Sequence, residues 1–117
     1  MTPTTLIVDD HDSFRGGARR LLEAGGLEVV GEASDAEGAM AAIACLRPEL
    51  VLLDIDLGTS SGFDVARQVT QADGGPVVIL ISSHEYSDFG VEIAACGARG
   101  FVAKDELSAA AVRKALA

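Results

Sequence analysis

Five short apolar segments recur along the chain, and each has the length of a β-strand. They occupy residues 5–9, 28–32, 50–54, 77–81 and 100–104. The third and fourth are apolar at nearly every position, so both faces of these strands are expected to be buried. Burial on both faces is typical of parallel strands covered by helices on either side. The pattern therefore favours an α/β protein with a central parallel sheet.

The segments between these strands carry apolar residues at helical spacing. The positions that define this spacing are Phe14, Ala18, Leu21 and Leu22; Met40, Ile43 and Leu46; Phe63, Ala66 and Val69; Val91, Ala94 and Ala95; Leu107, Val112 and Leu116. Strands and helices thus alternate five times with short connections. This (βα)5 order predicts a doubly wound, flavodoxin-like sheet with strand order 2-1-3-4-5.

Residues that start and stop helices agree with these boundaries. Ser34 or Asp35 can cap the second helix, and Ser61 stands directly before the third. Pro48 follows the second helix, where a proline ends helical structure. The local signals and the apolar spacing therefore predict the same elements.

Length and composition predict one domain over residues 1–117. A chain of 117 residues with 49% hydrophobic content can bury a single core without disulfides or structural metals. It has no apolar run of the roughly 18 residues that a membrane span requires, and no signal-peptide pattern at its start. We therefore expect a cytoplasmic domain with no membrane association.

The net charge of −9 limits the classes of partner. Binding of a nucleic-acid backbone requires a basic face, and nine cationic side chains stand against eighteen acidic ones. We expect no direct nucleic-acid binding by this segment, so any DNA binding would belong to another domain or chain.

Several of the acidic residues lie where predicted strands end. Asp9 and Asp10 end the first strand, Asp54 ends the third, and Asp56 follows two positions later. The first and third strands are neighbours in the predicted order, so these carboxylates converge at the switch point of the sheet, where α/β proteins bind ligands. Such close charges repel and require a cation or shifted pKa values. A set of oxygen ligands suits Mg²⁺.

Asp54 is the candidate nucleophile. A carboxylate can attack a phosphoryl group and form an aspartyl phosphate, and a metal ion then neutralises the approaching anions. Ser82 ends the fourth strand and Lys104 ends the fifth. A hydroxyl and an ammonium group at the same edge can bind the other phosphoryl oxygens.

Taken together, these segments resemble the receiver domains of bacterial response regulators, over nearly the whole chain. The resemblance rests on Ile7-Val-Asp-Asp-His11, Val51-Leu-Leu-Asp-Ile-Asp56, Ser60-Ser-Gly-Phe-Asp64, Ile81-Ser-Ser83 and Gly97-Ala-Arg-Gly-Phe-Val-Ala-Lys104. The opening Asp-Asp-His with a following Phe-Arg, the Val-Val-Gly-Glu-Ala at the second strand and the Lys104-Asp105 ending are most similar to regulators with a LuxR-type helix-turn-helix output domain.

The resemblance implies a role for each candidate residue. Asp54 would be phosphorylated by a histidine kinase, and Asp10, Asp54 and the backbone carbonyl of Asp56 would hold Mg²⁺. Asp9 would act largely through water. Ser82 would bind the phosphoryl group and Lys104 would pair with it.

A switch on the last strand is also implied. Phe101 would turn inward as Ser82 moves toward the phosphoryl group, although a permanently buried aromatic residue is an open alternative for Phe101. The expected result is a changed surface on the fourth helix, fifth strand and fifth helix. Asp105 replaces the proline that often follows the lysine in this family, which leaves the shape of that loop open.

The expected function is thus two-component signal transduction, and not enzymatic turnover of a separate substrate. The domain would catalyse only its own phosphorylation and dephosphorylation. Its partners would be a histidine kinase, an output domain or partner protein, and a second copy in a phosphorylation-dependent homodimer. We expect the output to be transcriptional.

Two alternatives remain at this point. A phosphorylation-independent binding module would share the fold, although such modules usually lack one of the acids or the lysine. A haloacid-dehalogenase-type phosphatase also uses an aspartyl phosphate and Mg²⁺, and residues 51–59 resemble its nucleophile loop. In that class, however, the motif lies on the first strand.

Overall fold

The computed structural model describes residues 3–58, 60–71, 74–83 and 90–117. The central strands are β1 (Thr4–Val8), β2 (Glu28–Ala33), β3 (Leu50–Asp54), β6 (Val77–Ser82) and β7 (Gly100–Ala103). The helices are α1 (Asp12–Ala24), α2 (Ala36–Leu46), α3 (Gly62–Thr70), α4 (Gly90–Ala95) and α5 (Ala109–Leu116). No helix in the described part of the chain is long and apolar enough to cross a membrane.

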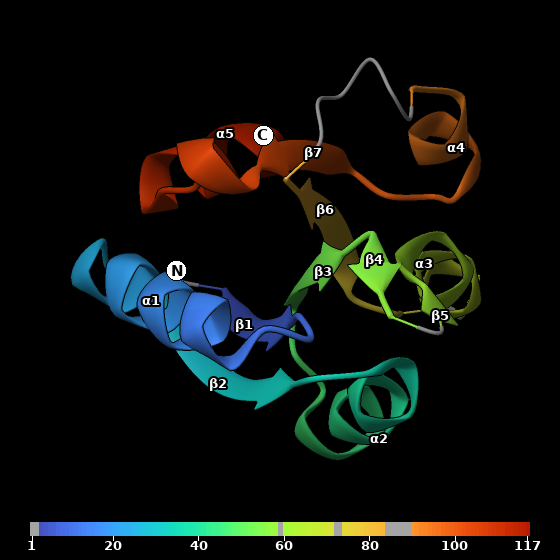
Figure 1. Cartoon of the computed structure of the whole chain (residues 1–117), viewed down its shortest axis with the longest axis horizontal. Coiled ribbons are helices and arrows are strands. Elements are labelled where there is room, and N and C mark those ends of the chain that lie inside the picture. Colours follow the sequence, from blue (N-terminus) through green and yellow to red (C-terminus); the bar gives the residue numbers. More distant parts are fainter. Residues whose placement is uncertain (1–2, 59, 72–73, 84–89) are drawn as a thin grey trace.

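The five central strands form one parallel sheet in the order β2-β1-β3-β6-β7. Counted along the central sheet, this is the predicted order 2-1-3-4-5, so the predicted fold class is confirmed. Helices α1 and α5 cover one face, and α2, α3 and α4 cover the other (Figure 1). The order reverses between β1 and β3, which makes their carboxyl ends the edge at which a ligand site is expected.

Each face of the sheet has its own apolar core, and β3 contributes to both. Leu50 and Leu52 pack toward α1 and α5, whereas Val51 and Leu53 pack toward α2, α3 and α4. All four side chains are fully buried. Alternate residues of a strand point to opposite faces, so the continuous apolar run of β3 fits a strand between two helical layers.

Helix boundaries follow the capping residues. The Asp35 carboxylate caps α2 by accepting a hydrogen bond from the Gly38 amide at 2.6 Å. Ser61 caps α3 by accepting one from the Phe63 amide at 3.2 Å. At the end of α2, Arg47 adopts a left-handed conformation with φ of 47° directly before Pro48. The residue before a proline avoids the helical region, so the helix ends there.

Some local expectations were wrong. Leu21, Leu46 and Val91 contributed to the helical spacing, but they are 46%, 43% and 81% exposed. Apolar spacing therefore marked these positions without fixing how far each side chain is buried. Leu107 precedes α5, because a short 3-10 turn (Lys104–Glu106) separates this helix from β7. This turn gives the loop at Asp105 its shape.

A small hairpin follows the central strand and was not predicted. It pairs β4 (Asp56–Leu57) with β5 (Ser60–Ser61) in antiparallel fashion. Two-residue strands have no apolar period that a sequence pattern can reveal. The hairpin leads directly into α3 at Gly62, whose amide donates to the Ile55 carbonyl at 2.7 Å.

Gly62→Ala should destabilise the domain, because a Cβ at this position would overlap the Asp54 carbonyl oxygen and the Ile55 Cα. Both are backbone atoms that cannot rotate away. We expect a loss of about 2 kcal/mol or more in the free energy of unfolding, measured by urea denaturation. Gly17→Ala is the matched control, since Gly17 lies within α1 with nothing within 4 Å of the added Cβ. This control should gain about 0.5–1 kcal/mol. Equal stability of the two variants would contradict the close approach.

Candidate functional site

The candidate residues meet at the carboxyl edge of the sheet. Asp9 follows β1, Asp54 ends β3, Ser82 ends β6 and Lys104 follows β7. Parallel strands in register bring these ends together, because Asp54 pairs with Ile81 on β6 and Ser82 pairs with Ala103 on β7. The structure therefore places residues from four strands, separated by up to 95 positions, around one site.

The acidic cluster consists of Asp9, Asp10, His11 and Asp54. One ligand atom from each lies within 4.8 Å of the others. Asp9 is fully buried and Asp54 is 3% exposed, whereas the Asp10 side chain is 33% exposed. The cluster thus has a buried floor and an open side. Three carboxylates and an imidazole within this distance can hold a divalent cation.

Lys104 neutralises part of this negative charge. Its ammonium nitrogen lies 2.6 Å from Oδ2 of Asp9 and donates a hydrogen bond to Oδ2 of Asp54 at 3.2 Å. It also lies 4.5 Å from the ring centroid of Phe14, within cation–π range. Burial lowers the pKa of Lys104, but pairing with the two aspartates outweighs burial and raises this pKa above its ordinary value. The lysine is therefore a fixed positive charge beside Asp54.

The carboxyl group of Asp54 has a strongly displaced pKa. Burial raises this pKa to about 6, and repulsion from Asp9 adds to the increase. The Asp56 amide, which donates to Oδ1 of Asp54 at 3.1 Å, and the Lys104 ammonium both act in the opposite direction. Desolvation exceeds the stabilisation that these two partners provide. The ionised form of Asp54 is thus favoured by any further cation at the site.

The contacts of Asp9 fit a further cation at this site. Its Oδ1 accepts a hydrogen bond from the His11 amide at 2.8 Å. Its Oδ2 is completely buried and accepts no hydrogen bond from the described residues, although the Lys104 ammonium forms an ion pair with it at 2.6 Å. The ion pair with Lys104, which also contacts Asp54, offsets only part of the cost of burying this carboxylate. An ordered water or a divalent cation at the cluster would relieve this cost.

Asp56, Ser82 and Phe101 have different positions. The Asp56 side chain is exposed, accepts a hydrogen bond from the Gly58 amide at 3.2 Å, and is not part of the acidic cluster. A metal contact by Asp56 would therefore use its backbone carbonyl, as the resemblance implies. Ser82 is 2% exposed at the end of β6. Phe101 is half-buried against the core of α2, α3 and α4.

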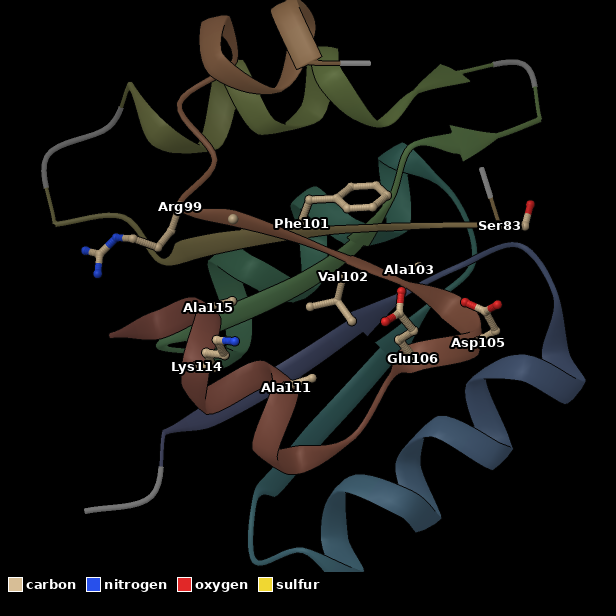
Figure 2. A pocket seen from close by; sticks show the side chains of 11 residues that line it. Ser83, Arg99, Phe101, Val102, Ala103, Asp105, Glu106, Ala111, Lys114 and Ala115 are labelled. Atoms are coloured by element: carbon tan, nitrogen blue, oxygen red, sulfur yellow. The ribbon is translucent and has the colours of Figure 1, made fainter. Parts of the chain in front are cut away.

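Phe101 borders a surface hollow between β7 and α5. Figure 2 shows its ring on β7, with Ala111, Lys114 and Ala115 of α5 along another wall of the hollow. Asp105 and Glu106 of the 3-10 turn line the end nearer the acidic cluster. The hollow therefore follows the edge strand that leads to Lys104.

Sequence reasoning missed three residues that shape the site. His11 places Nδ1 2.9 Å from Asp10 Oδ1 and 3.2 Å from Asp9 Oδ1. Phe14 supports the Lys104 ammonium, and Arg15 donates to the Asp9 backbone carbonyl. All three follow the first strand within six positions of Asp9. Their proximity to Asp9 in the chain could have indicated a role at the site. In the sequence, His11 and the Phe-Arg pair were considered only as part of the family resemblance.

Comparison with known families agrees with this geometry. The model of the response regulator receiver domain matches residues 5–117. The chain belongs to this family. Receiver domains bind Mg²⁺ at an acidic pocket, and in this chain the pocket corresponds to the acidic cluster. Members of the family work with histidine kinases and output domains in two-component systems.

Individual relatives place this receiver domain among the response regulators. It is 31% identical over 100 residues to the response regulator UvrY of Escherichia coli, which covers 85% of this chain and 46% of that protein. It is 34% identical over 83 residues to a protein-glutamate methylesterase/protein-glutamine glutaminase of Hahella chejuensis, which covers 71% of this chain and 24% of that enzyme. The chain thus spans half or less of the length of these curated relatives.

Solved structures confirm the receiver fold. A LuxR-family response regulator from Aurantimonas sp. SI85-9A1 has a TM-score of 0.86 and 32% identity, covering 99% of this chain and 83% of that chain. The expected similarity to receiver domains of LuxR-type regulators is therefore confirmed.

The raised pKa of Asp54 predicts a pH-dependent effect of Asp54→Asn on stability in EDTA. A carboxyl whose pKa is higher in the folded state stabilises the protein below its unfolded pKa, and this contribution is lost as the pH rises through about 6. At pH 7.5 the wild-type domain therefore carries a buried anion that the asparagine avoids. The variant should gain up to about 3 kcal/mol more at pH 7.5 than at pH 4, measured by urea denaturation.

Asp105→Asn is the control for this measurement, because it removes one negative charge from an exposed side chain. Its effect should stay within about 0.5 kcal/mol at both pH values. An Asp54→Asn effect that is the same at pH 4 and pH 7.5 would contradict a displaced pKa at Asp54.

Proposed function

We propose that this receiver domain accepts a phosphoryl group on Asp54 from a histidine kinase, with Mg²⁺, and thereby changes the surface formed by α4, β7 and α5. The observation that carries the proposal is the position of Asp54. It is a buried carboxylate at the end of the central strand, beside a cation-binding set of acids and 3.2 Å from a fixed ammonium group. Membership in the receiver family supports the same chemistry.

The chemical step is a transfer between two nucleophiles. An Asp54 carboxylate oxygen forms a bond to phosphorus while the bond from phosphorus to the donor imidazole nitrogen breaks, and the imidazole leaves with the electron pair. The Lys104 ammonium stands beside Asp54 and can pair with the phosphoryl oxygens as they arrive. Ser82, on the neighbouring strand end, can donate to another of these oxygens.

Mg²⁺ would be held by Asp10, Asp54 and the backbone carbonyl of Asp56, with Asp9 acting largely through water. When bound, it supplies the positive charge that lets an anionic phosphoryl donor approach three carboxylates. The buried Oδ2 of Asp9, which shares the Lys104 ammonium with Asp54, and the raised pKa of Asp54 both support a cation at this site. The His11 imidazole, 68% exposed, lies over the open side.

The route from the site to the surface runs along β7. Ser82 pairs with Ala103, which is next to Lys104, and Phe101 lies two residues earlier on the same face of the strand. Movement of Ser82 toward a phosphoryl group would therefore change the space next to Phe101. The Phe101 ring is half-buried against the core of α2, α3 and α4, which supports a change in its packing.

We also propose that the domain acts in the cytoplasm, in a two-component pathway that regulates transcription. The partners would be the kinase, an output domain or partner protein, and a second copy of the phosphorylated domain. The net charge of −9 argues against DNA binding by this segment, so any DNA binding would belong to another domain or chain. The chain would have no enzymatic activity beyond its own phosphorylation and dephosphorylation.

Incubation with acetyl phosphate and Mg²⁺ should add one labile phosphoryl group, detected by intact mass spectrometry. Asp54→Asn and EDTA should each abolish this gain, because the first removes the nucleophile and the second removes the charge-neutralising ion. Asp64→Asn, which changes an exposed aspartate on α3, should label like the wild type. Absence of labelling, under conditions that label another receiver domain, would favour a phosphorylation-independent module. Repeated turnover of a chromogenic phosphate ester would favour a phosphatase.

Addition of Mg²⁺ and beryllium trifluoride, a phosphoryl mimic, should shift the amide resonances of β7 and α5 and the ring resonances of Phe101. Asp54→Asn should show none of these shifts. Unchanged Phe101 ring resonances, with clear shifts around Asp54, would identify Phe101 as a permanently packed core residue. Each 1.4 kcal/mol of preference for the active form changes the population ratio by about tenfold. The extent of the shift therefore measures the coupling.

A further inference from the structure

We propose that Arg15 is a positioning residue, which fixes the peptide group between Asp9 and Asp10 and thereby sets the geometry of the acid pair for a divalent cation. This inference rests on the proposed function, since it assumes that the acid pair binds Mg²⁺. Arg15 belongs to α1 and lies outside the acidic cluster.

Three contacts hold the Arg15 guanidinium. One terminal nitrogen donates to the Asp9 backbone carbonyl, and the other pairs with Asp12. Its Nε donates to Oε1 of Glu32 on β2 at 3.1 Å. The side chain is only 13% exposed. A planar guanidinium with its donors in a fixed fork can satisfy all three acceptors at once, which a lysine ammonium cannot do with the same geometry.

The Asp9 carbonyl lies where the sheet no longer controls the backbone. The Asp9 amide still donates to the Ala33 carbonyl on β2 at 3.0 Å, but β1 itself ends at Val8. The next peptide carries the Asp9 carbonyl and the Asp10 amide in one rigid plane. Rotation of this plane would redirect the Asp10 side chain relative to Asp9. A hydrogen bond from Arg15 prevents this rotation.

Glu32 anchors the guanidinium to the sheet. Because Glu32 belongs to β2, the contacts of Arg15 connect β2, the start of α1 and the end of β1. Arg15 therefore fixes the position of the acid pair relative to the sheet. Hydrogen-bonded groups behind metal ligands commonly change metal affinity by about 10- to 100-fold when removed.

The charge of Arg15 by itself has the opposite effect. A positive group near the acids repels an incoming cation, so removing the charge alone would strengthen Mg²⁺ binding. Loss of positioning would weaken it. The sign of the change in Mg²⁺ affinity therefore separates the two roles.

Arg19 provides a matched control from the same helix. Its guanidinium pairs with the other carboxylate oxygen of Glu32 at 3.0 Å, and donates to the Val29 carbonyl at 3.2 Å. Within the described structure it contacts none of Asp9, Asp10 and Asp54, and it lies one helical turn from Arg15. Arg19→Met thus removes the same charge and a contact to Glu32 but leaves the Asp9 carbonyl bond intact.

The experiment measures Mg²⁺ affinity for the wild type and for three variants, Arg15→Met, Arg15→Lys and Arg19→Met. Each protein is titrated with Mg²⁺, and binding is detected by calorimetry and by ¹H–¹⁵N spectra. Arg15→Met should weaken Mg²⁺ binding by about tenfold or more, and Arg15→Lys should be intermediate. Arg19→Met should bind Mg²⁺ as tightly as the wild type or slightly more tightly. At saturating Mg²⁺, phosphorylation of Arg15→Met by acetyl phosphate should approach the wild-type rate, because the reacting groups are retained.

A second readout does not depend on the metal. The Asp10 amide shares its peptide group with the Asp9 carbonyl, so loss of the Arg15 hydrogen bond should shift the Asp10 amide resonance in Mg²⁺-free protein. Arg19→Met should leave that resonance in place. If Arg15→Met does not fold, both measurements are made on Arg15→Lys. This variant retains the positive charge, so a loss of Mg²⁺ affinity would reflect lost positioning.

Unchanged or tighter Mg²⁺ binding by both Arg15 variants would overturn the proposal, as would an unmoved Asp10 resonance. Failure of the wild-type domain to bind Mg²⁺ would instead overturn the proposed function. In that case the Asp10 resonance would still report whether Arg15 holds the Asp9 carbonyl. The two hypotheses therefore fail in distinguishable ways.

Discussion

The structure depends on how two buried carboxylates share one lysine. Asp9 and Asp54 lie at the ends of neighbouring strands, both almost without solvent, and the Lys104 ammonium contacts each of them. One positive charge cannot fully compensate two buried negative charges. Burial raises the pKa of Asp54 to about 6, and repulsion from Asp9 adds to the increase. The fold therefore carries an excess of buried negative charge at one edge. A cation at that edge would relieve this excess, which is the physical basis of the proposed metal binding.

The parallel sheet makes this arrangement possible. Both faces of the central strands are covered by helices, so their carboxyl ends are held at fixed positions between two apolar cores. The functional groups extend from these ends, and Lys104 reaches across from the strand at the sheet edge. Strand β6 pairs with β3 at Asp54 and with β7 at Ser82, so these two strands connect Asp54 to the edge of the sheet. These strands lead to the hollow beside α5.

Helix α1 has a larger part in the site than its sequence suggests. Phe14 lies beneath the lysine and Arg15 holds the peptide that carries the acid pair, so one helical turn contacts both charges of the site. Glu32 connects this turn to β2, at the opposite edge of the sheet from β7. Helix α1 thus contacts both the lysine and the acid pair. Their relative positions depend on how α1 packs on the sheet.

The sequence was enough to predict the five central strands, the order of the elements and the candidate site residues at the strand ends. Apolar runs such as residues 50–54 record burial on both faces, and Asp9, Asp54, Ser82 and Lys104 stand at strand ends that a parallel sheet must bring together. Only the tertiary structure decided which neighbours support them. The contacts of Phe14 with Lys104 and of Arg15 with Glu32 join segments that no local period relates. The exposure of Val91 and the hairpin after Asp54 were also undetermined, because local spacing states which residues share a helix face but not what covers that face.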